Sequence, residues 1–381
     1  MKKYLLLLIF VICLLPFNGW SASYYGCGAG AINGDATWCA VGDVTNGVCA
    51  KDSGDYVSGA TALAGTHTLY ANGCTITIPS GTFTAAKLST KGDGSKGAGG
   101  GFTIAENGVT ATVDASVEGG TTDCLTIGST TNTITANILT TNGGGTITTD
   151  ATAGADGIVI SGSNAIYTIG KSGSPVTVTG GGAANYAIND TSTTETQTIY
   201  ANITGGANAI AYGLFSGGAS GTINITGDIT GATGAGLRVD IGATINITGN
   251  CTGGSNVAGY GCTNTGSSSV MTVAGNCTAG SVEVAGCSSS NSATGYTTVT
   301  GNIIGTATNM GARGKINWSP ADTTPPSNYI KIWTGGTDFY YMTANPEPAV
   351  ADVKSGVTYG WDGSAVYTGT LATGGGGASA W

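Results

Sequence analysis

The chain has 381 residues, of which 68 are Gly and 9% are charged, and its formal net charge is −9. An average protein has roughly 7% Gly and about 25% charged residues, so this chain is rich in Gly and poor in charge. The composition excludes a coiled coil, which needs Leu, Glu and Lys at a period of about 3.5 residues. It also excludes nucleic-acid binding, because 12 Lys and Arg residues spread over the whole chain cannot form a basic stripe.

The first 23 residues have the three parts of a secretory signal peptide. Residues 1–3 (Met-Lys-Lys) precede the apolar residues 4–15, and the small residues 21–23 follow. The apolar run is shorter than the roughly 20 residues that a membrane-spanning helix needs. We therefore expect a signal peptide over residues 1–23, a secreted or cell-surface protein that begins at Tyr24, and no membrane span.

One sequence block recurs in the second half of the chain. It reads INITGDITG at residues 223–231, INITGNCTG at 245–253, MTVAGNCTA at 271–279 and TTVTGNIIG at 297–305. A second block, which begins with Gly at positions 213, 236, 261 and 286, lies between the copies. Two short alternating strands per 22 to 33 residues, separated by Gly and Asn turns, are typical of a β-solenoid.

We therefore predict an all-β protein built on a parallel β-helix (β-solenoid) over residues 66–311. Residues 24–65 are predicted to form an N-terminal cap stapled by disulfides, because an open coil is an unpaired sheet edge. Residues 312–381 are predicted to form a linker and a small aromatic-rich C-terminal β module. Alternation along the strand directs Ile223, Ile225 and Ile229 inward.

Two ladders are expected where equal positions stack on one another. Cys251 and Cys277 share one inward position, and Cys262 and Cys287 share another. Stacked strands lie about 4.8 Å apart, which is inside the disulfide range, so we predict a bridge between rungs in each pair; buried free thiols are the alternative. The second ladder consists of Asn side chains that bond one rung to the next, with Asp228 between them: Asn137, Asn202, Asn250, Asn276 and Asn302.

The remaining cysteines indicate the cap and no metal site. Cys27, Cys39 and Cys49 lie in residues 24–65, and Cys74 is a candidate partner for one of them. The spacings contain no CxxC pair, and His67 is the single histidine, so neither a zinc site nor any other cofactor is expected.

Residues 101–305 resemble right-handed parallel β-helix proteins, a class that includes adhesins, autotransporter passengers, phage tailspikes and pectin-degrading, pectin-lyase-like enzymes. Residues 348–371 resemble a short segment that recurs in phage virion-associated and bacterial surface proteins. The resemblance implies an extracellular or assembly role, and in its enzymatic branch it implies specific catalytic residues.

Those catalytic residues are mostly missing, so we do not expect an enzyme. Polygalacturonase-like sites use paired aspartates and a Gly-His-Gly element, whereas this chain has no Asp-Asp pair and His67 lies outside the repeat. Pectate-lyase-like sites need acidic calcium ligands and an arginine base on neighbouring coils. Arg238 and Asp240 share one outward face, but the neighbouring positions Phe215 and Thr263 cannot assist them.

The best hypothesis is a non-enzymatic extracellular or cell-surface, adhesin-like β-helix protein whose partner is a surface glycan or a protein. The alternatives are a tailspike-like protein that binds or degrades polysaccharide and, less favoured, ice binding through outward Thr columns such as Thr198, Thr272 and Thr298. Aromatic side chains are the candidate glycan contacts, although a structural aromatic stack is the competing interpretation for the tyrosines. The candidates are Tyr186, Tyr212, Tyr260, Trp318, Trp333 and Trp361.

Overall fold

The computed structural model describes the repeat region and shorter segments on either side of it. The described residues are 23–26, 30–31, 38–40, 44–45, 48–49, 68–78, 80–93, 98–128, 134–139, 145–150, 154–162, 165–192, 196–218, 221–281, 285–289, 295–305, 311–313, 316–318, 329–333, 339–342, 358–359 and 367–368. The predicted signal peptide lies outside these residues except for Ser23, and so does most of the predicted cap and linker.

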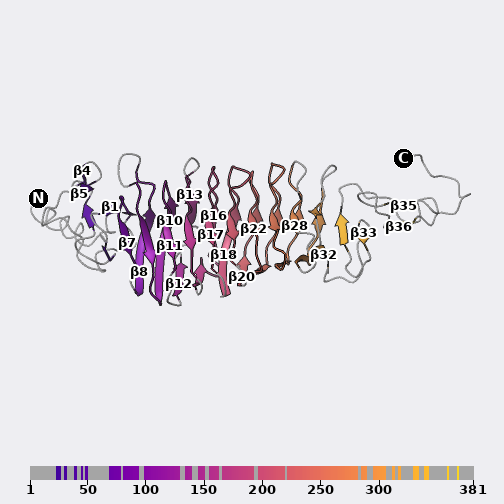
Figure 1. Cartoon of the computed structure of the whole chain (residues 1–381), viewed down its shortest axis with the longest axis horizontal. Coiled ribbons are helices and arrows are strands. Elements are labelled where there is room, and N and C mark those ends of the chain that lie inside the picture. The colour runs from indigo at the N-terminus through magenta and orange to yellow at the C-terminus, as the bar shows by residue number, and fades with distance from the viewer. Residues whose placement is uncertain are drawn as a thin grey trace, which may run out of the picture.

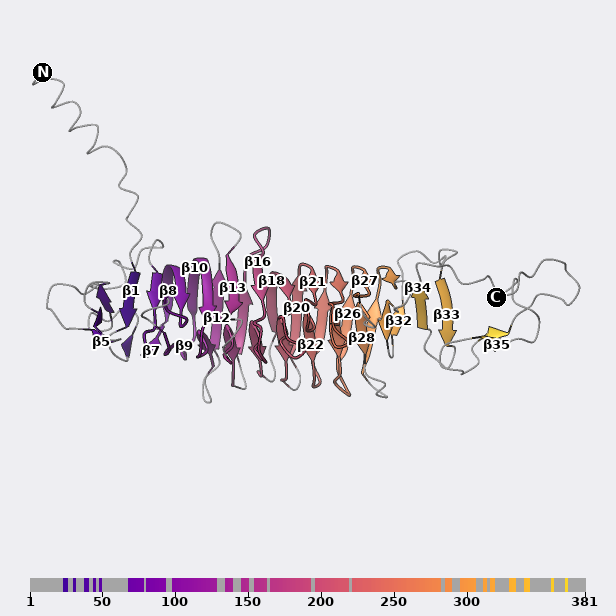
Figure 2. The same cartoon turned by 90° about the horizontal axis from the view of Figure 1, so that it is seen from above.

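The described part of the chain is all-β and forms a parallel β-solenoid, as the sequence predicts. Figures 1 and 2 show its strands lying side by side along one long axis, from the indigo β1 to the orange β32. Each coil contributes strands to three faces of a rod, and every face continues by parallel pairing with the next coil. No helix in the described residues is long and apolar enough to cross a membrane.

Face 1 is an 11-stranded sheet with one strand per coil. Its strands are β2 (Gly30–Ala31), β7 (Thr75–Thr77), β9 (Gly101–Ile104), β11 (Leu125–Ile127), β14 (Ile158–Ile160), β17 (Ile188–Asp190), β19 (Leu214–Ser216), β22 (Leu237–Val239), β25 (Cys262–Asn264), β28 (Cys287–Ser289) and β31 (Ala312–Arg313).

Faces 2 and 3 together form a 19-stranded sheet, because three long strands bend around the corner between them. The bent strands are β8 (Gly81–Ser89), β10 (Val109–Gly119) and β18 (Thr196–Thr204). Face 2 also contains β12 (Ile134–Leu139), β15 (Ala165–Ile169), β20 (Thr222–Thr226), β23 (Thr244–Ile247), β26 (Val270–Val273), β29 (Tyr296–Val299) and β32 (Ile316–Trp318). Face 3 also contains β1 (Ser23–Gly26), β6 (Thr68–Tyr70), β13 (Thr146–Thr149), β16 (Val176–Thr179), β21 (Ile229–Thr230), β24 (Cys251–Thr252), β27 (Cys277–Thr278) and β30 (Ile303–Ile304).

The interior is one continuous apolar core that runs from Leu69 to Ala312. It follows from strict alternation, since successive side chains of a strand point to opposite faces. The predicted inward residues Ile223, Ile225 and Ile229 are all buried, with exposed fractions of 2%, 1% and 0%. Because each inward side chain packs on its equivalents in the coils before and after, the core cannot form in a single coil.

At the N-terminal end, the parallel ladder extends into the region predicted as a cap. Strand β1 pairs in parallel with β6, and β2 pairs in parallel with β7. Strand β3 (Trp38–Ala40) then pairs antiparallel with β1 and so breaks the parallel repeat. The Tyr25 ring stacks on Tyr70 at 4.9 Å, and its hydroxyl donates to Asp93 at 2.6 Å.

The cysteines of the N-terminal region are described only in part. Cys74 is a free thiol that lies next to the backbone carbonyl of Asn72, so its expected role in a cap disulfide is wrong. The side chains of Cys27, Cys39 and Cys49 lie outside the described residues. A short hairpin of β4 (Val44–Thr45) and β5 (Val48–Cys49) belongs to the same region.

At the C-terminal end, two antiparallel hairpins replace the parallel repeat. The first pairs β33 (Tyr329–Trp333) with β34 (Phe339–Met342), and the second pairs β35 (Thr358–Tyr359) with β36 (Tyr367–Thr368). Strand β34 lies next to β30 and β32, the last strands of faces 3 and 2. The first hairpin therefore covers part of the final coil, where an open edge would otherwise be exposed to pairing with another chain.

Gly recurs where the chain turns from face 3 back into face 1, because the two backbones approach closely there. A Cβ atom at Gly261 would lie 2.6 Å from the carbonyl carbon and oxygen of Thr252. A Cβ at the equivalent Gly236 would lie 2.8 Å from the carbonyl oxygen of Gly261 in the next coil. The second sequence block begins with Gly for this reason, and the requirement is one of space rather than of backbone angle.

We expect Gly261→Ala to lower the free energy of unfolding by about 1–3 kcal/mol, because the added methyl group forces the two backbones apart. The control is Gly154→Ala, where the nearest atom to a Cβ would be Asn185 Oδ1 at 3.9 Å. Urea denaturation of both variants measures the difference. Equal stability of the two variants would contradict the close-approach explanation.

Candidate functional site

Aromatic and charged side chains come together along the outward column of face 1. Register places Asn189, Phe215 and Arg238 on three successive coils, and Thr263 on the next. Arg238 is therefore flanked by Phe215 and Thr263, as the sequence predicts. The corner that precedes this column adds Tyr186 and Tyr212. We call Tyr186, Tyr212, Phe215, Arg238 and Asp240 the aromatic–arginine cluster.

The rings of the cluster stack on one another along the solenoid axis. The centroids of Tyr186 and Tyr212 are 5.4 Å apart with an interplanar angle of 3°, and those of Tyr186 and Phe215 are 4.8 Å apart. The Arg238 guanidinium carbon lies 5.3 Å from the centroid of the Tyr212 ring, within the range of a cation–π contact. Its Nη1 also donates to the Tyr212 hydroxyl at 2.6 Å.

Polar groups at the edge of the cluster are engaged with one another. Arg238 Nε donates to Asp240 Oδ1 at 2.5 Å, and the Thr265 hydroxyl donates to the same oxygen. At the other end, Asp156 accepts from the backbone N–H of Tyr186 and from the side-chain amide of Asn189, at 2.8 and 2.7 Å. Burial raises the pKa of Asp156, and these two hydrogen bonds partly offset the effect.

The structure brings the predicted glycan contacts Tyr186 and Tyr212 together and leaves Tyr260 apart from them. Tyr212 is 5% exposed and lies between Tyr186 and Arg238, so its ring faces are not open to a sugar. Tyr260 lies two coils further along, beyond Ala235, and its hydroxyl accepts from Arg313 Nη1 at 3.4 Å. The stacked tyrosines therefore match the structural interpretation of this column. The side chains of Trp318, Trp333 and Trp361 lie outside the described residues.

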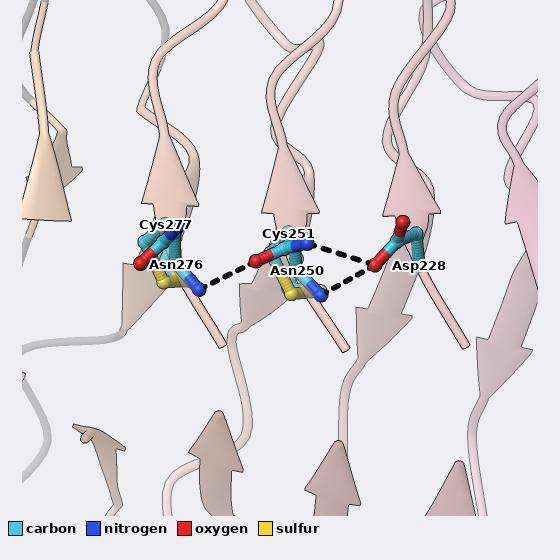
Figure 3. Close-up of a disulfide and its surroundings, with 7 residues drawn as sticks. Asp228, Asn250, Cys251, Asn276 and Cys277 are labelled. Carbon is cyan, nitrogen blue, oxygen red and sulfur yellow. Dashed lines mark hydrogen bonds between the residues drawn. A yellow bond between two sulfur atoms is a disulfide. The ribbon is translucent and has the colours of Figure 1, made fainter. Parts of the chain in front are cut away.

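The Asn ladder is present from Asn202 to Asn302, but its bonds differ from those expected. Each side-chain oxygen accepts from the backbone N–H of the next rung: Asn202 from Asp228 at 3.1 Å, Asp228 from Asn250 at 2.9 Å, and Asn250 from Asn276 at 2.9 Å. Asn276 accepts from Asn302 in the same way, at 2.9 Å. One side-chain amide also donates along the ladder: Asn250 Nδ2 bonds to Asp228 Oδ1 at 3.0 Å (Figure 3).

The assignment of Asn137 to this ladder is wrong. Asn137 lies opposite Thr168, which in turn lies opposite Thr198. That column continues to Asn224 on the outward side of face 2, whereas Asn202 lies opposite Thr177. The strand that carries Asn137 has six residues and no turn between its halves, so Asn137 lies on the strand and not at the turn that holds the ladder.

The four repeat cysteines stack as predicted, but the predicted bridges are wrong. Cys251 lies opposite Cys277, and Cys262 lies opposite Cys287. The disulfides instead join Cys251 to Cys262 and Cys277 to Cys287, with Cα–Cα distances of 5.7 and 5.4 Å. Each bond joins face 3 to face 1 across the turn between them. Figure 3 shows Cys251 and Cys277 on adjacent coils. Stacked Cβ atoms point in the same direction, whereas cysteines on adjoining faces point toward each other.

A buried polar cluster inside the solenoid was missed from the sequence. Asp190 is 2% exposed; its Oδ2 accepts from the Tyr167 hydroxyl at 3.0 Å, and its Oδ1 accepts from the backbone N–H and hydroxyl of Ser192. Gln197 closes the cluster, because its Nε2 donates to Ser192 Oγ and its Oε1 accepts from the Tyr167 backbone. Alternation from the inward Ile188 would have placed Asp190 inside, so the signal was present in the repeat.

Burial raises the pKa of the Asp190 carboxyl, and the hydrogen bonds from Ser192 and Tyr167 lower it by less. The described side chains include no cation paired with it: the ion pairs found there involve Glu118, Asp150 and Asp240. A buried carboxylate without a cation is costly to ionise, which is why the pKa of Asp190 is higher in the folded protein than in the unfolded chain.

The described residues show neither a cluster of metal ligands nor an activated thiol at Cys124. Within them, no three His, Cys, Asp or Glu side chains come together at the distances that a metal ion needs. Burial raises the pKa of the Cys124 thiol to about 12, which makes the nucleophilic thiolate scarce at neutral pH.

Comparisons with known proteins identify no relative of this chain. No family model matches it, no curated protein matches it, and no solved structure matches it.

We expect the stability of the protein to fall as the pH rises through the folded-state pKa of Asp190. The folded state holds this proton more tightly than the unfolded state does, so the stabilisation is present at low pH and is lost on ionisation. Asp190→Asn should remove this component of the pH dependence, whereas the control Asp228→Asn at an exposed rung should retain it. Urea denaturation between pH 4 and 7 measures the slopes, and an unchanged slope in Asp190→Asn would refute the assignment.

Proposed function

We propose that this protein is a non-enzymatic extracellular or cell-surface structural protein in which the β-solenoid serves as an adhesin-like stalk. The observation that carries the proposal is the continuity of bonding along the axis. All three faces pair in parallel from coil to coil, and the Asn ladder adds a fourth line of axial hydrogen bonds. A rod of this kind resists bending because no coil is joined to the next by a single flexible linker.

The two disulfides support an extracellular location. Disulfides persist in oxidising compartments and are rare in a reducing cytosol. Each bond here closes a short turn, Cys251–Cys262 and Cys277–Cys287, in adjacent coils near the C-terminal end of the rod. The signal-peptide pattern of residues 1–23 points to the same compartment.

A structural role also fits the state of the charged groups in and beside the aromatic–arginine cluster. Arg238 is committed to Asp240 and to the Tyr212 hydroxyl, and Asp156 is committed to the amide of Asn189. Groups that already hold each other are poorly placed for proton transfer to a substrate, since a general acid or base must reach the substrate within about 3 Å.

We expect the protein recovered from its own host to contain both disulfides and to release no new chain ends from acidic polysaccharides. Cleavage after Tyr260 by chymotrypsin and after Met271 by cyanogen bromide separates Cys251, Cys262 and the Cys277–Cys287 segment. The observed pairing predicts that the Cys251 and Cys262 peptides remain linked to each other and to nothing else. Axial bridges would link all three peptides. Four freely alkylated cysteines, or cleavage of any polysaccharide, would refute the proposal.

A second candidate function is glycan binding at the aromatic–arginine cluster, favoured by half-buried rings, a cation and a carboxylate on neighbouring coils. The contact would use the outward edges of Tyr186 and Phe215 and the polar groups of Arg238 and Asp240. On a glycan array, Arg238→Ala should reduce binding about tenfold or more, as expected for a lost charge-assisted hydrogen bond. The matched control is Arg313→Ala, which should bind like the unmodified protein. Failure of the unmodified protein to bind any glycan would exclude this function.

A further inference from the structure

One corner of the solenoid interior lies where face 1 turns toward face 2. Its inward residues change from polar to apolar and back to polar along the rod. Its inward column runs through Asp190, Ser216, Val239, Asn264 and Ser289 on successive coils. At Asp190 the polar groups bond directly to one another. At Val239 the corner is apolar. At Asn264 and Ser289 it becomes polar again, and there the side chains do not satisfy one another.

Four buried side-chain oxygens in this second polar region have no hydrogen-bond partner among the described residues: Asn264 Oδ1, Ser269 Oγ, Ser289 Oγ and Thr297 Oγ1. The exposed fractions of these residues are 0%, 0%, 6% and 0%. Most buried polar groups in folded proteins bond to protein or to ordered water, so four orphans in one place require an explanation.

The four side chains are neighbours around Asn264. Its Nδ2 donates to the backbone carbonyl of Ser269 at 2.9 Å and to that of Tyr296 at 3.1 Å. Thr297 follows Tyr296 and points inward from β29, while Ser289 lies directly opposite Asn264 on the next coil. Two adjacent coils thus bring all four oxygens to the same corner.

We propose that this corner is a binding site for ordered internal water held between the last coils of the solenoid. The side-chain oxygen of Asn264 can only accept, whereas each of the three hydroxyls can both donate and accept. A water molecule has two donors and two acceptor sites and commonly makes about three hydrogen bonds when buried. The four side chains are neutral, so water fits them better than a cation, which would need a paired negative charge.

A high-resolution crystal structure of the full chain tests the site directly. The expected result is water density within hydrogen-bonding distance of Asn264 Oδ1 and of at least one of the three hydroxyls. A corner that contains no water, with these four oxygens still unpaired, would overturn the proposal.

The substitution Thr297→Val gives an independent test whose sign distinguishes the two cases. If the hydroxyl binds water, its removal leaves the water and its other partners unsatisfied, and Tm should fall by about 2–4 °C. If the hydroxyl is dry and unpaired, its removal should leave Tm unchanged or raise it, which would refute the proposal. Thr298→Val, on the outward side of the same strand, is the matched control and should have little effect.

The pair Ser289→Ala and Thr297→Val then tests whether both hydroxyls share the water. A shared water predicts that the two shifts in Tm are not additive, because the first substitution already disrupts the hydrogen bonds that the second would remove. Strict additivity would contradict a common site.

Discussion

The spacing of about 4.8 Å between hydrogen-bonded parallel strands is the constraint on which this molecule depends. Because the coils stack in register, each side chain lies over its equivalent in the previous coil. An apolar residue that recurs becomes a continuous core, and an amide that recurs becomes a ladder of axial hydrogen bonds. The same constraint explains the turn glycines, since a Cβ at Gly236 or Gly261 would press on neighbouring backbone in every copy.

The turns between faces, and not the register, decide how the cysteines pair. The stack brings Cys251 next to Cys277, yet parallel neighbours direct their side chains the same way along the coil. The turn from face 3 to face 1 brings Cys251 and Cys262 together from adjoining faces, with their side chains convergent. The bonds therefore strengthen single coils, while hydrogen bonds and apolar packing join one coil to the next. Because no disulfide joins these two coils, the stiffness of the rod along its axis does not depend on the redox state of these cysteines alone.

Two groups of buried polar residues lie at one corner of the rod, and their hydrogen bonds are satisfied in different ways. Around Asp190, hydrogen bonds from Tyr167 and Ser192 satisfy both oxygens of the carboxyl group. Around Asn264, the side chains leave four oxygens for another partner. On the outside, the rings of the aromatic–arginine cluster stack face to face on one another. The surface that remains for a partner consists of ring edges and a few polar atoms, which suits a stalk better than a deep binding site.

The sequence by itself determined the all-β class, the parallel solenoid and the inward direction of Ile223, Ile225 and Ile229, because a period of two residues repeated in tandem admits few other folds. It also determined the stacking of Cys251 on Cys277 and most of the Asn ladder. Only the tertiary structure decided the disulfide partners, the column of Asn137 and the coverage of Tyr212. These depend on where the chain bends between faces, and bend positions vary from coil to coil with turn length. The sequence repeat fixes which residues stack from coil to coil, whereas the cross-section of each coil fixes which side chains contact one another within it.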